Sequence, residues 1–282
     1  MIIQWFPGHM AKTRRLILEN MKLVNAVCEV IDARIPISSR NPDIDELMGN
    51  KPRLIIFNRI DQADADMSKK WVAHFKNAGA GVIKTDCKSG KGVDALPAAA
   101  RLLLSDKLAA YTQKGQTGRS LRLMVVGIPN VGKSSLINRA AGRRAAQTSD
   151  RPGVTRGKQW INIESGIELL DTPGVLWPKF EDQTVGENLA FTGAIRDEVM
   201  DIESLGAAFM SRLAQYYPDK ITERYKIDIP KGAGGHELLT EAAKKRGFLI
   251  AGGEYDTLRM AVAILDEFRG GKLGRITLEE PS

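Results

Sequence analysis

The sequence predicts an α/β domain built on a six-stranded, mostly parallel sheet, followed by a small all-α domain. Six short runs are rich in branched or apolar residues, helical patterns separate most of them, and no strand pattern occurs beyond about Trp177. Strands that alternate with helices favour a parallel sheet that is covered on both faces. A chain of 282 residues has room for one sizeable core and a smaller second domain, at roughly 150 residues per domain.

The elements follow in order along the chain. The expected strands cover residues 24–31, 53–57, 81–84, 121–127, 159–163 and 167–171. Helices are expected at 10–21, 67–78, 134–141 and 255–268, and the last of these repeats Leu258, Val262, Leu265 and Phe268 on one face. Residues 105–120 lose apolar periodicity and collect Gly, Gln, Lys and Ser, so they are expected to form a surface connector.

Composition and charge favour a cytoplasmic protein with a polyanionic partner. No apolar stretch approaches the ~20 residues that span a bilayer, no secretory signal is present, and two cysteines cannot form a disulfide framework. The net charge is +7, but residues 1–179 carry 28 Lys and Arg against 16 Asp and Glu, whereas residues 180–282 carry 13 against 18. This positive field fits either nucleic acid or a solvated basic face.

The strongest local motif is a phosphate-binding loop, GIPNVGKS, from Gly127 to Ser134. Its two glycines let successive backbone N–H groups face phosphate oxygens, and the following helix start favours anions. Lys133 is expected to reach the β- and γ-phosphates, and Ser134 is expected to ligate Mg²⁺. The expected phosphate contacts are Asn130, Val131, Gly132, Lys133, Ser134, Ser135, Thr155 and Gly174.

Two further positions complete the expected phosphate and magnesium site. Asp171 begins an Asp-Thr-Pro-Gly motif at the end of an apolar strand, where its carboxylate would hold Mg²⁺ and the Gly174 N–H would sense the γ-phosphate. Thr155 lies in a basic segment that contains Gly and Pro, and it is expected to close on Mg²⁺ when GTP is bound.

A guanine-reading motif occurs near the N-terminus, at Asn58, Arg59, Ile60 and Asp61. An aspartate at this place accepts two hydrogen bonds from guanine, and adenine lacks both donors, so selectivity of roughly 10⁴-fold is expected. Arg59 stands where lysine is usual. After the next strand, Asp86 and Cys87 lie in a loop of the kind whose backbone N–H meets guanine O6.

The base motifs therefore precede the phosphate motifs, which is a circular permutation of the usual order of P-loop GTPases. The expected domains are a basic arm and helix at 1–22, a circularly permuted GTPase domain at 23–178 with its linker at 105–120, and a helical, RNA- or ribosome-binding domain at 179–282. In this order the Asp171 motif leads directly into the helical domain. We hypothesise that nucleotide state reorients that domain.

With these motifs, the chain resembles the ribosome biogenesis GTPase A family from end to end. The resemblance includes Trp5 to Lys12 (WFPGHMAK) and Asp32 to Pro42 (DARIPISSRNP). It implies a cytoplasmic assembly factor for a late step of large ribosomal subunit biogenesis. It also implies a C-terminal domain that contacts ribosomal RNA and GTP hydrolysis that the subunit stimulates.

Hydrolysis requires a group that positions water, and Val175 stands where many GTPases place glutamine. The resemblance points instead to His9 as the catalytic residue, although His9 also fits a merely structural role at the start of a helix. Asn130 resembles the asparagine of potassium-activated GTPases, which implies a K⁺ site.

Contacts to RNA are expected from the N-terminal arm, from the basic segment 139–158, and from local clusters in the acidic C-terminal region, namely Lys244, Lys245, Arg246, Arg269, Lys272 and Arg275. The main alternative is a GTP-dependent regulatory switch whose C-terminal domain binds a protein. A P-loop kinase of small metabolites and a scaffold that never hydrolyses GTP are further alternatives. The chain is expected to be monomeric away from the ribosome.

Overall fold

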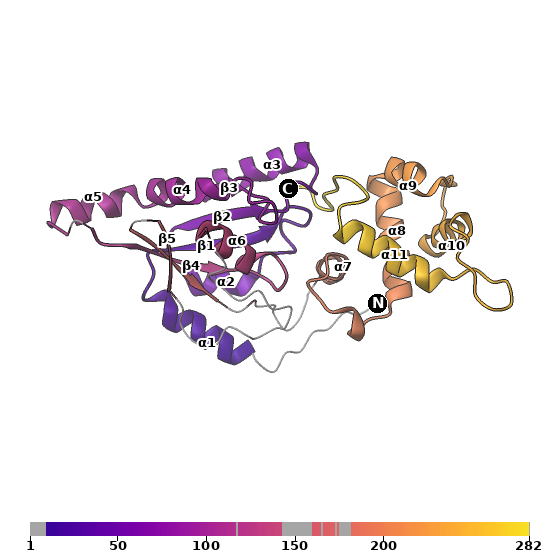
Figure 1. The fold of residues 1–282 in the computed structure, drawn as a ribbon, viewed down its shortest axis with the longest axis horizontal. Coiled ribbons are helices and arrows are strands. Elements are labelled where there is room, and N and C mark those ends of the chain that lie inside the picture. The colour runs from indigo at the N-terminus through magenta and orange to yellow at the C-terminus, as the bar shows by residue number, and fades with distance from the viewer. Residues whose placement is uncertain are drawn as a thin grey trace. The chain divides into compact units, whose positions relative to one another are not determined.

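The computed structural model describes residues 10–116, 118–142, 160–164, 166–172, 174 and 182–281. The described chain forms two compact units (Figure 1). The first, here called the GTPase unit, contains the described residues from 10 to 174 together with 279–281. The second, the helical unit, contains residues 182–278.

The GTPase unit is built on one six-stranded sheet. Its strands are β1 (Ala26–Asp32), β2 (Arg53–Asn58), β3 (Gly81–Lys84), β4 (Leu121–Val126), β5 (Trp160–Glu164) and β6 (Ile167–Asp171), in the spatial order β3-β2-β1-β4-β6-β5. Only β5 is antiparallel to its neighbour, β6. The prediction of a six-stranded, mostly parallel sheet is confirmed.

Helices cover both faces of this sheet. They are α1 (Met10–Met21), α2 (Pro42–Met48), α3 (Ala65–Asn77), α4 (Leu96–Leu103), α5 (Ser105–Gln113) and α6 (Lys133–Ala140), with a 3₁₀ turn η1 (Val93–Ala95). Val27 packs with α1 and α2, and Ile31 packs with α3. Because side chains alternate along a strand, the odd-numbered residues of β1 define one face. Leu54 lies on the other face, near Leu103 of α4.

The expected surface connector at 105–120 is in part a helix. Residues Ser105–Gln113 form α5, and none of them is buried. Leu104, directly before α5, is buried. Apolar periodicity did not reveal this helix because α5 has no packed face, and Ala, Leu, Lys and Gln favour helical backbone without one.

The helical unit comprises α7 (Gln183–Phe191), η2 (Asp197–Val199), α8 (Ile202–Tyr216), α9 (Pro218–Tyr225), α10 (Gly235–Lys245) and α11 (Thr257–Arg269) (Figure 1). Its core contains a row of aromatic rings, in which Phe209 lies 4.9 Å from Phe191 and 4.7 Å from Phe268 between centroids. Gly206 lets α8 approach α11, since a Cβ there would lie 2.4 Å from the Ala261 Cβ. The small all-α domain is thus confirmed.

The predicted face of α11 was partly wrong. Leu265 and Phe268 are buried, but Leu258 and Val262 are 52% and 45% exposed. Met260, Ala261 and Ile264 take their places in the core. Several apolar faces can be drawn on a helix this rich in apolar residues, and α8 and α10 decide which of them is buried.

Among the described residues, no helix combines the length and apolar character that crossing a membrane requires.

Candidate nucleotide site

The sequence motifs meet at one edge of the sheet. The phosphate loop follows β4, the base motif ends β2, the base loop follows β3, and Asp171 ends β6. These four strands are parallel, so their carboxyl ends lie on the same side. Ligands of open α/β sheets bind at this edge.

The phosphate loop has the backbone that anion binding requires. Gly127 and Gly132 have φ values of 151° and 108°. Residues that carry a side chain rarely adopt such values. A Cβ on Gly127 would lie 2.5 Å from the Val30 carbonyl oxygen, and one on Gly132 would lie 2.3 Å from Asn58 Nδ2. Gly132 is the N-cap of α6 and no side chain caps this helix. The first N–H groups of α6 are therefore available to an anion.

Two buried residues of the site carry charge: Lys133 in this loop and Asp171 at the end of β6. Lys133 Nζ donates to the carbonyl oxygens of Gly127 and Ile128 at 3.1 and 2.8 Å. Burial lowers the pKa of Lys133 to about 8, although Asp171 opposes the shift. Burial also raises the pKa of Asp171, against the effect of Lys133. Both groups are thus held in a place where ionisation is unfavourable without a ligand.

The same carboxylate fits a magnesium ligand. Asp171 Oδ1 is buried and has no hydrogen-bond partner among the described residues. A buried carboxylate oxygen without a partner is costly, and Mg²⁺ prefers oxygen ligands. Ser134 and Ser135 are half-buried in the first turn of α6. Asp171 and Ser134 are therefore suitable to hold Mg²⁺ together with a nucleotide.

Gly174 lies against the phosphate loop. A Cβ at this position would come within 2.9 Å of Lys133 Nζ and within 2.9 Å of the Pro129 backbone. The structure thus brings together the Asp-Thr-Pro-Gly motif and the loop lysine, as γ-phosphate sensing requires.

Asn58 joins three motifs by hydrogen bonds. Its Nδ2 donates to the Val131 carbonyl oxygen at 2.7 Å, and its Oδ1 accepts from the Cys87 N–H at 3.0 Å. The Thr85 hydroxyl also donates to Oδ1, at 3.3 Å. Thr85 begins the base loop that the sequence predicts, but its hydrogen bond to Asn58 was not expected. Asn58 thereby fixes the base loop against the phosphate loop.

The other base residues differ in exposure. Asp61 is exposed and Ile60 is half-buried, so the Asp61 carboxylate is accessible to a base. Asp86 Oδ1 accepts from the N–H groups of Lys88 and Ser89 at 2.9 and 3.2 Å. Asp86 therefore shapes the base loop through its own side chain.

Arg59 takes part in a buried ionic cluster that the sequence did not reveal. It donates to the Asn130 carbonyl oxygen at 3.0 Å and lies 3.5 Å from Asp32 Oδ2. Burial opposes ionisation of Asp32, yet Arg34 and Arg59 hold the pKa of Asp32 below its ordinary value. Arg34 pairs with Asp32 at 2.7 Å and is fully buried. Asp32, at the carboxyl end of β1, therefore positions Arg59.

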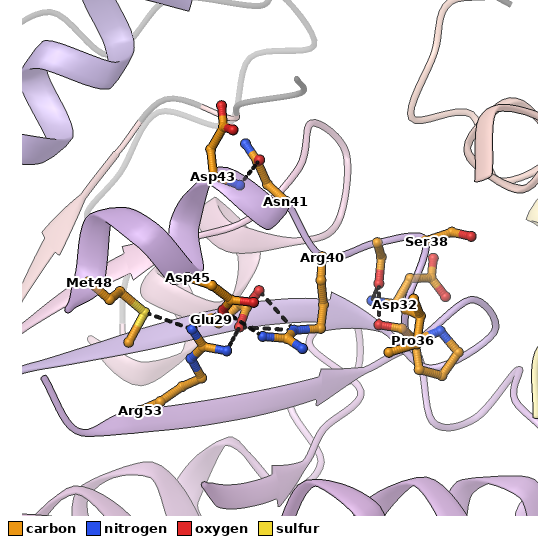
Figure 2. Close-up of polar contacts among 12 residues, drawn as sticks. Glu29, Asp32, Pro36, Ser38, Arg40, Asn41, Asp43, Asp45, Met48 and Arg53 are labelled. Atoms are coloured by element: carbon orange, nitrogen blue, oxygen red, sulfur yellow. Dashed lines mark hydrogen bonds and ion pairs between the residues drawn. The ribbon is translucent and has the colours of Figure 1, made fainter. Parts of the chain in front are cut away.

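A second buried carboxylate fixes the segment that follows β1 (Figure 2). Glu29 lies between the guanidinium groups of Arg40 and Arg53, at 3.3 and 3.4 Å. Asp45 pairs with both arginines. Burial raises the pKa of Glu29, and the two arginines oppose that shift. This network anchors Arg40 and so holds residues 33–41 beside Asp32.

Two of the expected site residues are not placed with the others. His9 and Thr155 lie outside the described residues, as does Val175. Asn130, the expected K⁺ ligand, is exposed in the phosphate loop with a φ of 59°. Its carbonyl oxygen already accepts from Arg59.

Two of the basic residues expected to contact RNA are engaged inside the helical unit. Arg269 pairs with Asp197 at 2.7 Å and donates to the Ala190 and Phe191 carbonyl oxygens. Arg246 pairs with Glu267 at 2.9 Å. Their charges stabilise the unit, and they are correspondingly less suited to bind phosphate.

The fold and this site define a class: a P-loop GTPase whose motifs occur in circularly permuted order. A family model described as 50S ribosome-binding GTPase matches residues 122–209. The ribosome biogenesis GTPase A of Bacillus cereus is 46% identical over 282 residues, which is all of this chain and 95% of the relative. The chain belongs to the ribosome biogenesis GTPase A family.

More distant relatives and two solved structures also match this chain over nearly its whole length. The ribosome biogenesis GTPase A of Thermotoga maritima is 32% identical over 99% of this chain and 95% of its own length. A solved structure of GNP-bound YlqF from T. maritima matches with a TM-score of 0.65 and 30% identity, over 96% of this chain and 99% of that one. A GDP-bound YlqF structure matches with a TM-score of 0.69 over 95% and 99%.

Proposed function

We propose that this protein hydrolyses GTP as an assembly factor for a late step of large ribosomal subunit biogenesis, and that it does so when docked on the subunit. The observation that carries the GTPase activity is the buried Lys133–Asp171 pair, with Gly174 against it. Kinship with the ribosome biogenesis GTPase A family carries the ribosomal role. The protein acts in the cytoplasm and is monomeric away from the ribosome.

The phosphate side of the site binds the triphosphate and its metal. Lys133 exchanges two carbonyl partners for β- and γ-phosphate oxygens. Backbone N–H groups from Asn130 to Ser135 surround the phosphates. Ser134, Thr155 and Asp171 would hold Mg²⁺, which would neutralise charge on the phosphates. The unpartnered Asp171 Oδ1 supports this arrangement.

The base side selects guanine through Asp61. Its exposed carboxylate accepts from the guanine N1–H and the exocyclic amine, while Arg59 covers the base and Cys87 and Asp86 belong to the loop near O6. The Asn58 hydrogen bonds to Val131 and Cys87 support this proposal because they fix the phosphate loop and the base loop relative to each other.

Hydrolysis requires a group that positions the attacking water, and this group comes from outside the nucleotide site. Val175 cannot orient water, so His9 is the proposed catalytic residue, and docking on the subunit brings its arm into place. Asn130 would hold K⁺, which would supply additional positive charge near the phosphates. Equal hydrolysis rates in K⁺ and Na⁺ buffers would remove the K⁺ site from the mechanism.

A second candidate function is a GTP-dependent switch whose helical unit binds a protein. Five large apolar residues are exposed within one short part of this unit: Leu249, Ile250, Tyr255, Leu258 and Val262. Exposed apolar residues that gather in one region are typical of protein interfaces. The internal pairing of Arg246 and Arg269 also weakens the case for RNA in this unit.

The test is GTP hydrolysis in K⁺ buffer with purified large ribosomal subunits, with small subunits as the control. Strong stimulation by large subunits alone is the expected result. His9→Ala should then abolish the stimulation and leave GTP binding unchanged. No stimulation by either particle, with no co-sedimentation, would favour the protein-binding switch.

A further inference from the structure

A pocket lies at the opposite end of the sheet from the nucleotide site. It has a volume of about 200 Å³ and is lined by Leu23, Asn25, Tyr111, Arg119, Ser120 and Arg122. Leu23 and Asn25 precede β1, and Ser120 and Arg122 lie at the start of β4. The strand β4 separates the pocket from the phosphate loop, and six extended residues span roughly 20 Å.

The pocket is held together by hydrogen bonds between its own residues. Asn25 exchanges two bonds with Arg122, one through its backbone N–H and one through its side-chain oxygen, at 2.7 and 2.8 Å. Asn25 Nδ2 donates to the Tyr111 hydroxyl at 3.4 Å. These contacts join α5 to the start of the sheet, so the surface helix that connects the two halves of the sheet also builds one wall of the pocket.

Two guanidinium groups at the pocket are stacked on aromatic rings. Arg119 lies 4.8 Å from the Tyr111 ring centroid, and Arg122 lies 4.8 Å from that of Trp160. Such contacts hold the planar groups against the rings, and the N–H groups at their edges can still donate hydrogen bonds. Arg119 also bonds to Gln116 and Arg122 to Glu168, so each keeps further donors for a ligand, because a guanidinium has five.

Lys51 adds a positive charge beside this pocket. Lys51 Nζ donates to the carbonyl oxygen of Val24, the residue between Leu23 and Asn25, at 2.7 Å. Burial lowers the pKa of Lys51, and nearby Lys107 lowers it further, which indicates that the two ammonium groups share this end of the unit. Glu168 supplies negative charge at this pocket and forms an ion pair with Arg122.

We propose that this pocket binds single-stranded RNA, with a backbone phosphate between Arg119 and Arg122 and a neighbouring base against Tyr111 and Leu23. Unpaired RNA is recognised by basic grooves that carry aromatic or arginine stacking surfaces, and the pocket combines both. The inference rests on the proposed function, in which the RNA is ribosomal. It adds a contact on the GTPase unit, separate from the nucleotide.

The test measures binding of a fluorescent twelve-residue oligouridine to the full-length protein over a range of salt concentrations. The variant is Arg119→Glu with Arg122→Gln, where glutamine avoids a new acidic group beside Glu168. The matched control is Lys70→Glu with Lys76→Gln, on exposed positions of α3. Binding of fluorescent GDP and thermal melting verify that each variant is folded.

The pocket variant should bind oligouridine about ten-fold more weakly at 0.1 M salt. Its log–log salt slope should fall by about 0.7 for each RNA phosphate that the variant no longer neutralises. The control and GDP binding should not change. Absence of oligouridine binding by the wild type, or equal affinity of wild type and pocket variant, would overturn the proposal.

Large subunits provide a separate readout for the proposed function. If the wild type does not co-sediment with large subunits, the ribosomal role fails, while the oligouridine result still decides on the pocket. If the pocket variant no longer binds large subunits but keeps wild-type affinity for oligouridine, the pocket contacts a ribosomal protein and the RNA proposal is wrong.

Discussion

The nucleotide site and the helical unit both bury ionic groups, but they satisfy them differently. In the GTPase unit, Asp171 leaves a buried oxygen without a described partner, and Lys133 is held by carbonyl oxygens at a lowered pKa of about 8. In the helical unit, Glu267 accepts from Arg224, Tyr225 and Arg246 at 2.7–2.9 Å. Burial opposes ionisation of Glu267, yet these bonds lower its pKa to about 2.

The difference separates a binding site from a structural anchor. An ionic group whose partners are all supplied by the chain stabilises the fold, whereas one left under-satisfied destabilises the free protein and gains its partners from a ligand. Variants of Lys133 should therefore affect nucleotide turnover, and variants of Glu267 should affect stability.

We expect Lys133→Met to reduce the rate of GTP hydrolysis more than any of the following substitutions. This substitution keeps most of the side-chain volume and removes the charge. GTP hydrolysis should fall about 10³-fold, because the ammonium binds charge that develops on the phosphates. The melting temperature of the nucleotide-free protein should not fall, since a desolvated charge is removed. Phosphate release and a thermal melt measure the two effects, with Lys70→Met as the control. A lower melting temperature with normal hydrolysis would make Lys133 a structural residue.

Glu267→Gln should show the opposite pattern. Loss of the carboxylate leaves Arg224 and Arg246 without a counter-charge, and the free energy of unfolding should fall by about 2–4 kcal/mol. GDP affinity should be unchanged. Urea denaturation measures the effect, and Glu241→Gln, in an exposed pair with Lys244, is the control. Because the pKa is lowered in the folded protein, the stabilisation should be present above about pH 4.5 and should disappear as the pH falls toward 2.

The free energy of unfolding of the nucleotide-free protein should also depend on alkaline pH through Lys133. Its pKa is about 8 in the folded protein, against an ordinary value of 10.5, so the unfolded chain binds more protons between these values. Stability from this residue therefore rises with pH across that window, by about 1–2 kcal/mol between pH 7.5 and 9.5. The contribution of Lys133 is obtained by subtracting the pH dependence of the free energy of unfolding of Lys133→Met from that of the wild type. Identical curves would contradict the shifted pKa.

A variant of Glu279 tests whether the hydrogen bonds of a carboxylate, and not the unit in which it lies, decide between a role in stability and a role in hydrolysis. Glu279 belongs to the GTPase unit, but its carboxylate accepts from the Ile37 and Ser38 N–H groups at 2.6 and 3.0 Å and from the Ser38 hydroxyl. Glu279→Gln should lower the free energy of unfolding by about 1 kcal/mol without changing GTP hydrolysis. Glu280→Gln, at a neighbouring position, serves as the control. A hydrolysis defect specific to Glu279→Gln would contradict the conclusion that carboxylates with partners in the protein contribute only to stability.

Much of the fold and of the phosphate loop could be predicted from the sequence. All six strands were located to within about two residues at most of their ends, because buried parallel strands form continuous apolar runs. Gly127 and Gly132 were identified because few residues other than glycine adopt their φ values. The permuted motif order is a property of the sequence itself.

Other features depended on contacts between residues distant in the sequence. The buried face of α11, the pairing of Arg246 with Glu267, and the Asn25–Tyr111 contact each join elements that no local pattern connects. The strands, the turns and the phosphate loop can be located from the amino-acid sequence, because backbone preference and apolar periodicity are local. Which charged groups have partners in the protein, and which remain for a ligand, becomes known only from the folded chain, because packing brings those partners together.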